Sequence, residues 1–235
     1  MVFLPGAGSF GLDFLLVHER VKQLLQTVGV LGPYLLVGHS LGGVYAQRYA
    51  QRFPDEVAGL LLLDPAHEDW DLYMPEHLQI ARNQTPDSQM PDLPEGFLAQ
   101  YRGPFADMFA AFPPLVRDLR VDKHLGPERL STGFREGANV LDVFDELRAG
   151  GDRPDIPMII LSGTGIDPAQ KMLAAEAQLR EQIAGSEKLY EAIVAKSPRA
   201  EHRSLDDASH LTIPMARPDA VAAAISDVID RAYGQ

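Results

Sequence analysis

The sequence predicts an α/β fold in which a mostly parallel sheet is flanked by helices. Short apolar runs alternate along the chain with longer helical patterns, which is the rhythm of parallel strands joined by helical crossovers. In addition, residues 35–54 place one serine between glycines where an apolar run ends and a helical pattern begins. At 235 residues, with 46% hydrophobic residues, the chain is long enough to bury one large core.

The expected elements follow from the apolar runs and from the residues that end them. Helices are expected at 41–53, where apolar side chains recur every four residues before Pro54, and at 171–183 and 218–232. The expected strands are 2–4, 34–38, 57–63 and 158–161, with a weaker fifth at 202–205.

The stretch 67–154 breaks this alternation. It is rich in proline and carries half of the aromatic residues without a clear strand. We therefore divide the chain into a core at 1–66 and 155–235 and a helical cap or lid insertion at 67–154. Phe105, Met108, Phe109 and Phe112 fall on one helical face, where buried packing is favoured over a substrate wall.

Composition excludes several classes of protein. The net charge of −12 disfavours binding to nucleic acid or to an anionic membrane, and the absence of cysteine removes thiolate metal sites and cysteine nucleophiles. No apolar run, including the one at 60–63, is long enough to span a bilayer. We therefore expect a soluble, cytoplasmic protein with a small-molecule substrate; the sequence does not determine its oligomeric state.

Ser40 is the residue with the clearest chemical context. In a tight strand-to-helix turn, a side chain is held above the sheet only if its neighbours two positions away are small, and Gly38 and Gly42 satisfy this requirement. The helix that follows directs its free N–H groups and positive dipole end at the same place, where they stabilise developing negative charge. A hydroxyl placed there is positioned to attack a carbonyl.

The segment "LLVGHSLGGVYAQRYAQRFPDEVAGLLLLDPA" resembles the serine hydrolases of the α/β-hydrolase fold. The resemblance implies chemistry without a cofactor or metal and the chain order nucleophile, acid, histidine. A serine needs a base, and His210, in the loop "SLDDASHLTIPMARPDAV", is the best candidate. Asp167 follows a strand where the family keeps its acid; Asp64, at the end of the 57–63 run, is the alternative.

The oxyanion that forms during acyl transfer needs two N–H donors. One is expected from Leu41, directly after Ser40. By resemblance to the family's His-Gly-x-Gly loop, the other is expected from Ala7 in "FLPGAGSFG", although Pro5 stands where many relatives carry histidine.

One departure from the family pattern lies between the strands at 2–4 and 34–37. Only about 30 residues separate these strands, so one strand-helix unit between the oxyanion loop and the nucleophile turn is expected to be missing near residues 19–22. Either the protein lacks this unit, which would leave the first strand as an exposed edge, or the sequence omits residues of the natural protein, the interpretation we favour.

These residues predict a carboxylesterase-like hydrolase that cleaves an ester-type bond of a small or medium apolar substrate through an acyl-enzyme at Ser40. The fold and triad do not select among ester, thioester, lactone and amide substrates, perhydrolysis or carbon-carbon cleavage. A peptidase remains open, because Glu68, Asp69 and Asp71 could receive a substrate amine. The alternative from another class is a non-catalytic hydrolase-like domain that binds a ligand or partner.

Overall fold

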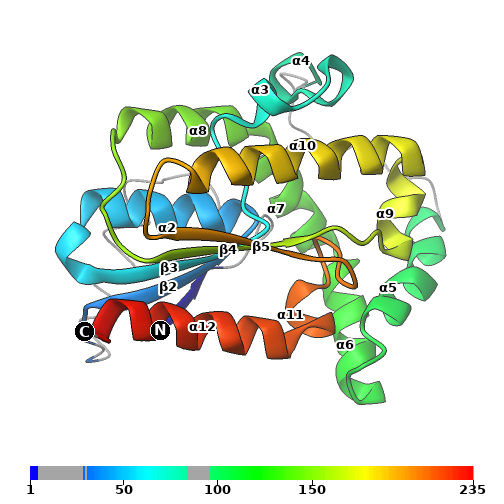
Figure 1. Ribbon diagram of the computed structural model, residues 1–235. Helices are drawn as coiled ribbons and strands as arrows, with labels where there is room; N and C mark the ends of the chain where they lie inside the picture. Colours follow the sequence, from blue (N-terminus) through cyan, green and yellow to red (C-terminus); the bar gives the residue numbers. More distant parts are fainter. Residues whose placement is uncertain (5–28, 30, 84–95, 235) are drawn as a thin grey trace.

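The computed structural model describes residues 1–4, 29, 31–83 and 96–234, and its strands form one parallel five-stranded sheet (Figure 1). The sheet order is β1-β2-β3-β4-β5, so each strand pairs with its neighbours in the sequence. The strands are β1 (Val2–Leu4), β2 (Tyr34–His39), β3 (Val57–Leu63), β4 (Met158–Gly163) and β5 (Ala200–Leu205). All five strands expected from the sequence are present, and three of them are one or two residues longer than expected.

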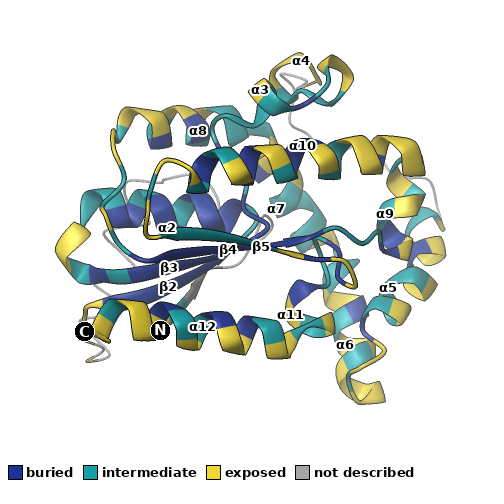
Figure 2. Ribbon diagram, viewed as in Figure 1, coloured by how far each residue is buried: buried dark blue, intermediate teal, exposed yellow. Residues whose placement is uncertain are grey.

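Both faces of the sheet are covered by helices, which explains why β2, β3 and β4 are apolar on both sides rather than alternating. In β3, Leu60 and Leu62 belong to the cluster on one face, and Leu61 belongs to the cluster on the other. Helices α2 (Leu41–Arg52), α8 (Val140–Ala149) and α10 (Glu176–Val194) lie on the first side, and α12 (Pro218–Tyr233) lies on the second (Figure 1). Figure 2 shows that the buried faces of these helices are turned toward the sheet.

The sequence predicted one helix at 171–183, but two are present. Helix α9 (Pro168–Leu173) ends before Ala174, and α10 begins at Glu176. The chain restarts there because the Gln178 side chain accepts a hydrogen bond from the backbone N–H of Ala175, at 3.3 Å, and so caps the new helix. Helix α11 (Ile213–Ala216) precedes α12. No helix in the described parts of the chain is long and apolar enough to cross a membrane.

In the described part of the segment between β3 and β4, every regular element is a helix. Its elements are α3 (Trp70–Tyr73), η2 (Glu76–Leu78), α4 (Ile80–Asn83), η3 (Phe97–Tyr101), α5 (Arg102–Met108), α6 (Pro114–His124), α7 (Pro127–Ala138) and α8. Phe109 is buried, and the guanidinium of Arg120 lies 4.8 Å from the ring centres of both Phe109 and Phe112, so this aromatic run joins α5 to α6. The division into core and cap remains a prediction.

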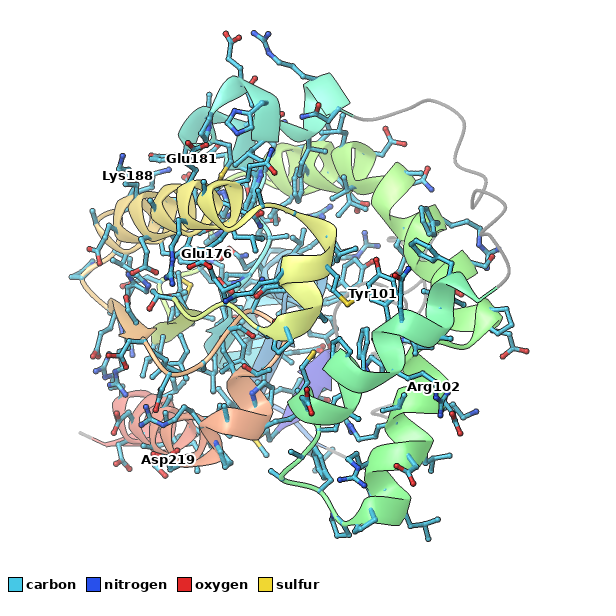
Figure 3. The ribbon with its side chains drawn as sticks, turned by 90° about the vertical axis from the view of Figure 1, so that its right-hand side faces the viewer. Tyr101, Arg102, Glu176, Glu181, Lys188 and Asp219 are labelled. Atoms are coloured by element: carbon cyan, nitrogen blue, oxygen red, sulfur yellow. The ribbon has the colours of Figure 1, made fainter. Side chains whose placement is uncertain are left out.

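Helix α8 connects this helical segment to the core. Phe144 and Leu147 on α8 form a buried cluster with Leu41 and Val44 on α2. A second contact with the core is made by α5, which packs against α9. Tyr101, just before α5, is buried, whereas the next residue, Arg102, is exposed to solvent (Figure 3).

Within the described residues, β1 is an edge strand. The segment that follows it, 5–28, lies outside the described residues, so the missing strand-helix unit and the position of Ala7 stay predictions.

Candidate active site

Ser40 occupies the turn between β2 and α2, in the backbone conformation that the sequence predicted. Its φ is +54°, which is rare for a residue with a side chain. A Cβ on Gly38 would lie 2.5 Å from the backbone oxygen of Gly42, so only glycine fits at position 38. The turn is held because the N–H of Ser40 donates to the Leu63 carbonyl (3.0 Å) and its carbonyl accepts from the N–H of Ala66 (3.0 Å).

Leu41 is the first residue of α2, directly after Ser40. The N–H groups in the first turn of a helix have no partner within the helix, and they carry its positive dipole end. The backbone N–H of Leu41 is therefore available, by position, as an oxyanion donor.

His210 is held against Asp64 rather than against Asp167. The Nδ1 atom of His210 lies 3.0 Å from Oδ2 of Asp64, which follows β3. The side chain of Asp64 is 10% exposed and that of His210 is 35% exposed. The arrangement leaves the other ring nitrogen of His210, Nε2, as the atom that can exchange a proton with a substrate or a serine.

Tyr190 on α10 holds the other oxygen of this carboxylate. Its hydroxyl lies 2.8 Å from Oδ1 of Asp64 and 3.0 Å from the carbonyl of Pro65. Burial, together with the charge of Asp64, raises the pKa of Tyr190 well above its usual value, so the hydroxyl is a donor. Nothing in the sequence around Tyr190 signals this contact, because it joins residues 126 positions apart.

Asp167, the acid expected from the sequence, makes different contacts. It is the N-cap of α9, where its Oδ1 accepts from the N–H of Gln170 (2.8 Å). Its Oδ2 accepts from the hydroxyl of Ser209 (2.7 Å). Asp167 thus contacts the residue before His210 and fixes the histidine loop, while the hydrogen bond to the imidazole is made by Asp64.

Gly163, the last residue of β4, and Gly165, just after it, allow the histidine loop to approach closely. A Cβ on Gly163 would lie 2.6 Å from the backbone of Ser209, and one on Gly165 would lie 2.8 Å from the carbonyl oxygen of Ala208. The N–H of Gly165 donates to that carbonyl at 2.8 Å. The loop that carries His210 is therefore packed against the end of β4.

The electrostatics of the two histidines at the site differ. Burial lowers the pKa of His210, but the hydrogen bond and charge of Asp64, with a smaller contribution from Asp167, raise it overall. Burial and the neighbouring His210 lower the pKa of His39 to about 4, so His39 is neutral near pH 7. Its Nε2 donates to the backbone carbonyl of His210 at 2.8 Å, which makes His39 a support for the loop.

Ser40, Asp64 and His210 line one cavity of about 200 Å³. Part of its wall is apolar and part is polar. The apolar residues are Pro65, Ala66, Trp70, Ile80, Leu179 and Ile183, and the polar residues added by α9 and α10 are Gln170, Gln182, Ser186, Glu187 and Tyr190. A cavity of this size accommodates a small substrate or one part of a larger one.

The acids that follow β3 have structural partners. Glu68 forms an ion pair with Arg153 at 2.8 Å. Asp71 accepts hydrogen bonds from the backbone N–H groups of Ile80 (2.7 Å) and Ala81 (2.9 Å). Neither residue lines the described wall of the Ser40 cavity. Among the described residues, no group of three histidine, aspartate or glutamate side chains could hold a metal ion.

Comparison with known sequences identifies the family. The sequence profile of the alpha/beta hydrolase family matches residues 2–224. Lipase LipV of Mycobacterium tuberculosis is 57% identical over 35 residues, or 15% of this chain. The matched segments span only 9% and 13% of the length of the two curated relatives found first, so these relatives are matched over a small part of their sequences.

Solved structures give the same fold at low sequence identity. Cfl2 of Burkholderia cenocepacia is 18% identical, with a TM-score of 0.61 over 96% of this chain and 86% of its own. A thermophilic esterase of Thermogutta terrifontis is 19% identical, with a TM-score of 0.56 over 98% of this chain and 78% of its own. The α/β-hydrolase fold expected from the sequence is confirmed.

Proposed function

The chain belongs to the alpha/beta hydrolase family, and on this premise we propose that it is a serine hydrolase that cleaves an ester-type bond of a small or medium substrate. The observation that carries the proposal is the His210–Asp64 hydrogen bond, made in the same cavity that receives the strained Ser40 turn. Such a turn costs folding free energy of about 1–3 kcal/mol. The strained conformation is explained if the Ser40 hydroxyl must be held above the sheet for the reaction.

In the proposed reaction, the Ser40 hydroxyl attacks the carbonyl carbon while Nε2 of His210 takes its proton. The Leu41 N–H and the first turn of α2 stabilise the oxyanion, and Ala7 is the expected second donor. His210 then returns the proton to the leaving alcohol, and water, activated by the same histidine, releases the acyl group. We assign to Asp64 the role first expected of Asp167: it holds the proton on Nδ1 and stabilises the imidazolium.

The apolar part of the cavity supports an apolar substrate body. Trp70, Ile80 and Leu179 offer surface for an acyl or alkyl group next to Ser40. This supports an ester more directly than it supports a highly polar substrate such as a sugar.

Labelling with a fluorophosphonate probe, followed by intact-mass measurement, tests the proposal without knowledge of the substrate. The wild type should gain one probe mass. Ser40→Ala should gain none, and His210→Ala should react much more slowly. The matched control is Ser131→Ala, a serine in α7 outside the cavity, which should label like the wild type. A folded wild type without any adduct would contradict the proposal and favour a non-catalytic, ligand-binding hydrolase-like domain.

A further inference from the structure

Glu187 is an acid in the Ser40 cavity with no role in the proposed triad. It lies on α10 in a stripe with Leu179, Ile183 and Tyr190, which recur at three- and four-residue spacing and line the cavity together. Glu176, Glu181 and Lys188, also on α10, are exposed and labelled in Figure 3. Glu187 is therefore the charged residue that α10 adds to the cavity.

The contacts of Glu187 fix its carboxylate. Its Oε1 accepts from the hydroxyl of Ser162 (2.6 Å), and its Oε2 accepts from the hydroxyl of Ser204 (2.5 Å). Burial alone raises the pKa of Glu187, but hydrogen bonds from His202, Ser162 and Ser204 outweigh it and lower the pKa to about 2. The group is therefore ionised at neutral pH, and its oxygens keep an acceptor position beyond those that the two serines and His202 use.

The neighbouring His202 forms an ion pair with Glu187, with its Nε2 atom 3.5 Å from Oε1, but it shares its charge with a second carboxylate, Glu191. Its Nδ1 lies 2.8 Å from a carboxylate oxygen of Glu191, which only accepts, so Nδ1 donates. Its Nε2 lies 2.7 Å from the Ser162 hydroxyl, whose own hydrogen goes to Glu187, so Nε2 also donates. His202 is thus an imidazolium between two carboxylates, and the cluster keeps one net negative charge.

The wall around Glu187 suits a cation. No lysine or arginine is among the described residues that line the cavity, and the other carboxylate there, Asp64, is engaged by His210 and Tyr190. Trp70 also lines the cavity, and the face of an indole attracts cations. The side chain of Glu187 is 28% exposed, so a substrate group can reach it.

We propose that Glu187 is a specificity-determining residue and that the substrate carries a cationic amino group on the part that enters this cavity. The inference rests on the proposed serine hydrolase function and deepens it by naming a substrate class: apolar esters that bear an ammonium group. Glu187 acts on the substrate and takes no part in proton transfer.

The test compares two esters that differ in charge alone. The p-nitrophenyl esters of 4-(trimethylammonio)butanoate and of 5,5-dimethylhexanoate have the same shape, because a quaternary carbon replaces the nitrogen. The wild type should prefer the cationic ester in kcat/KM by about tenfold, or about 1.4 kcal/mol, because the quaternary ammonium is attracted to the Glu187 carboxylate by charge alone. Glu187→Gln should lower this ratio about tenfold, whereas Glu181→Gln, an exposed acid on the same helix, should leave it unchanged.

Two further measurements keep the test decisive. If Glu187→Gln fails to fold, the wild-type ratio measured at rising salt replaces it, because an ion pair weakens with ionic strength and the neutral ester does not respond. A ratio near one in a wild type that labels with fluorophosphonate would overturn the inference and leave the serine hydrolase proposal in place. A wild type that does not label would overturn that proposal itself.

Discussion

Replacing each candidate acid by its amide separates the roles of Asp64 and Asp167. In Asp64→Asn, the Tyr190 hydroxyl still donates toward Oδ1, so the amide oxygen stays on that side and the NH₂ group faces His210. A donor facing Nδ1 forces the imidazole proton onto Nε2, the atom that must accept the proton of Ser40. The base is then in the wrong tautomer. The analogous Asp→Asn substitution in a serine protease triad lowers kcat by about 10⁴, which corresponds to about 5 kcal/mol in activation free energy.

Asp167→Asn perturbs the histidine loop rather than the imidazole. It weakens the charged hydrogen bond from Ser209, while asparagine still caps α9, so the free energy of unfolding should fall by only about 0.5–1.5 kcal/mol. The rate should fall less than about tenfold. The assay is the second-order rate of fluorophosphonate labelling, with thermal unfolding measured alongside. A large loss in Asp167→Asn, together with a rate near wild type in Asp64→Asn, would refute the assignment.

Three further predictions concern the same site. The labelling rate should rise with pH through a midpoint above 6.5, because the neutral form of His210 is the base and its pKa is raised. In Asp64→Asn this midpoint should move down, because the carboxylate that raises the pKa is gone. Tyr190→Phe removes the hydrogen bond to the acid and should slow labelling about 2- to 10-fold without loss of fold; an unchanged rate would contradict a positioning role. Gly43→Ala should lower the free energy of unfolding by about 1–3 kcal/mol, because its Cβ would lie 2.6 Å from a proline Cβ. The control is Gly133→Ala, which has open space around it and should not destabilise the protein. Urea unfolding of the two variants measures the difference.

The fold could be predicted because its signals are local. Strands β2, β3 and β4 are apolar runs buried on both faces, and α2 is indicated by its four-residue spacing and by Pro54. Strand β5 is mostly polar, which is why its sequence signal is weaker. The division between α9 and α10 could not be predicted, because the apolar pattern continues through it. It depends on the side chain of Gln178, which caps the start of α10 by accepting from the backbone N–H of Ala175.

The part of the candidate site that could be predicted is the part whose geometry is set by neighbouring residues in the sequence. Ser40 and Leu41 follow from the strand-turn-helix pattern alone, and Gly38 is required by a contact four residues away. Tyr190 and Glu187 could not be identified, because their partners lie far away in the sequence and a glutamate on a long helix is usually solvated.

The two candidate acids are alternatives because of how parallel strands end. β3 and β4 are adjacent, with Leu63 paired to Leu161, so both place the residues that follow them at one edge of the sheet, beside the end of β2. The histidine loop meets both: Ser209 contacts Asp167 and the next residue, His210, contacts Asp64. The acid that pairs with the imidazole therefore depends on whether the histidine side chain is turned toward the end of β3 or toward the end of β4. A fold with this edge can keep the same chemistry while the acid moves between neighbouring strands.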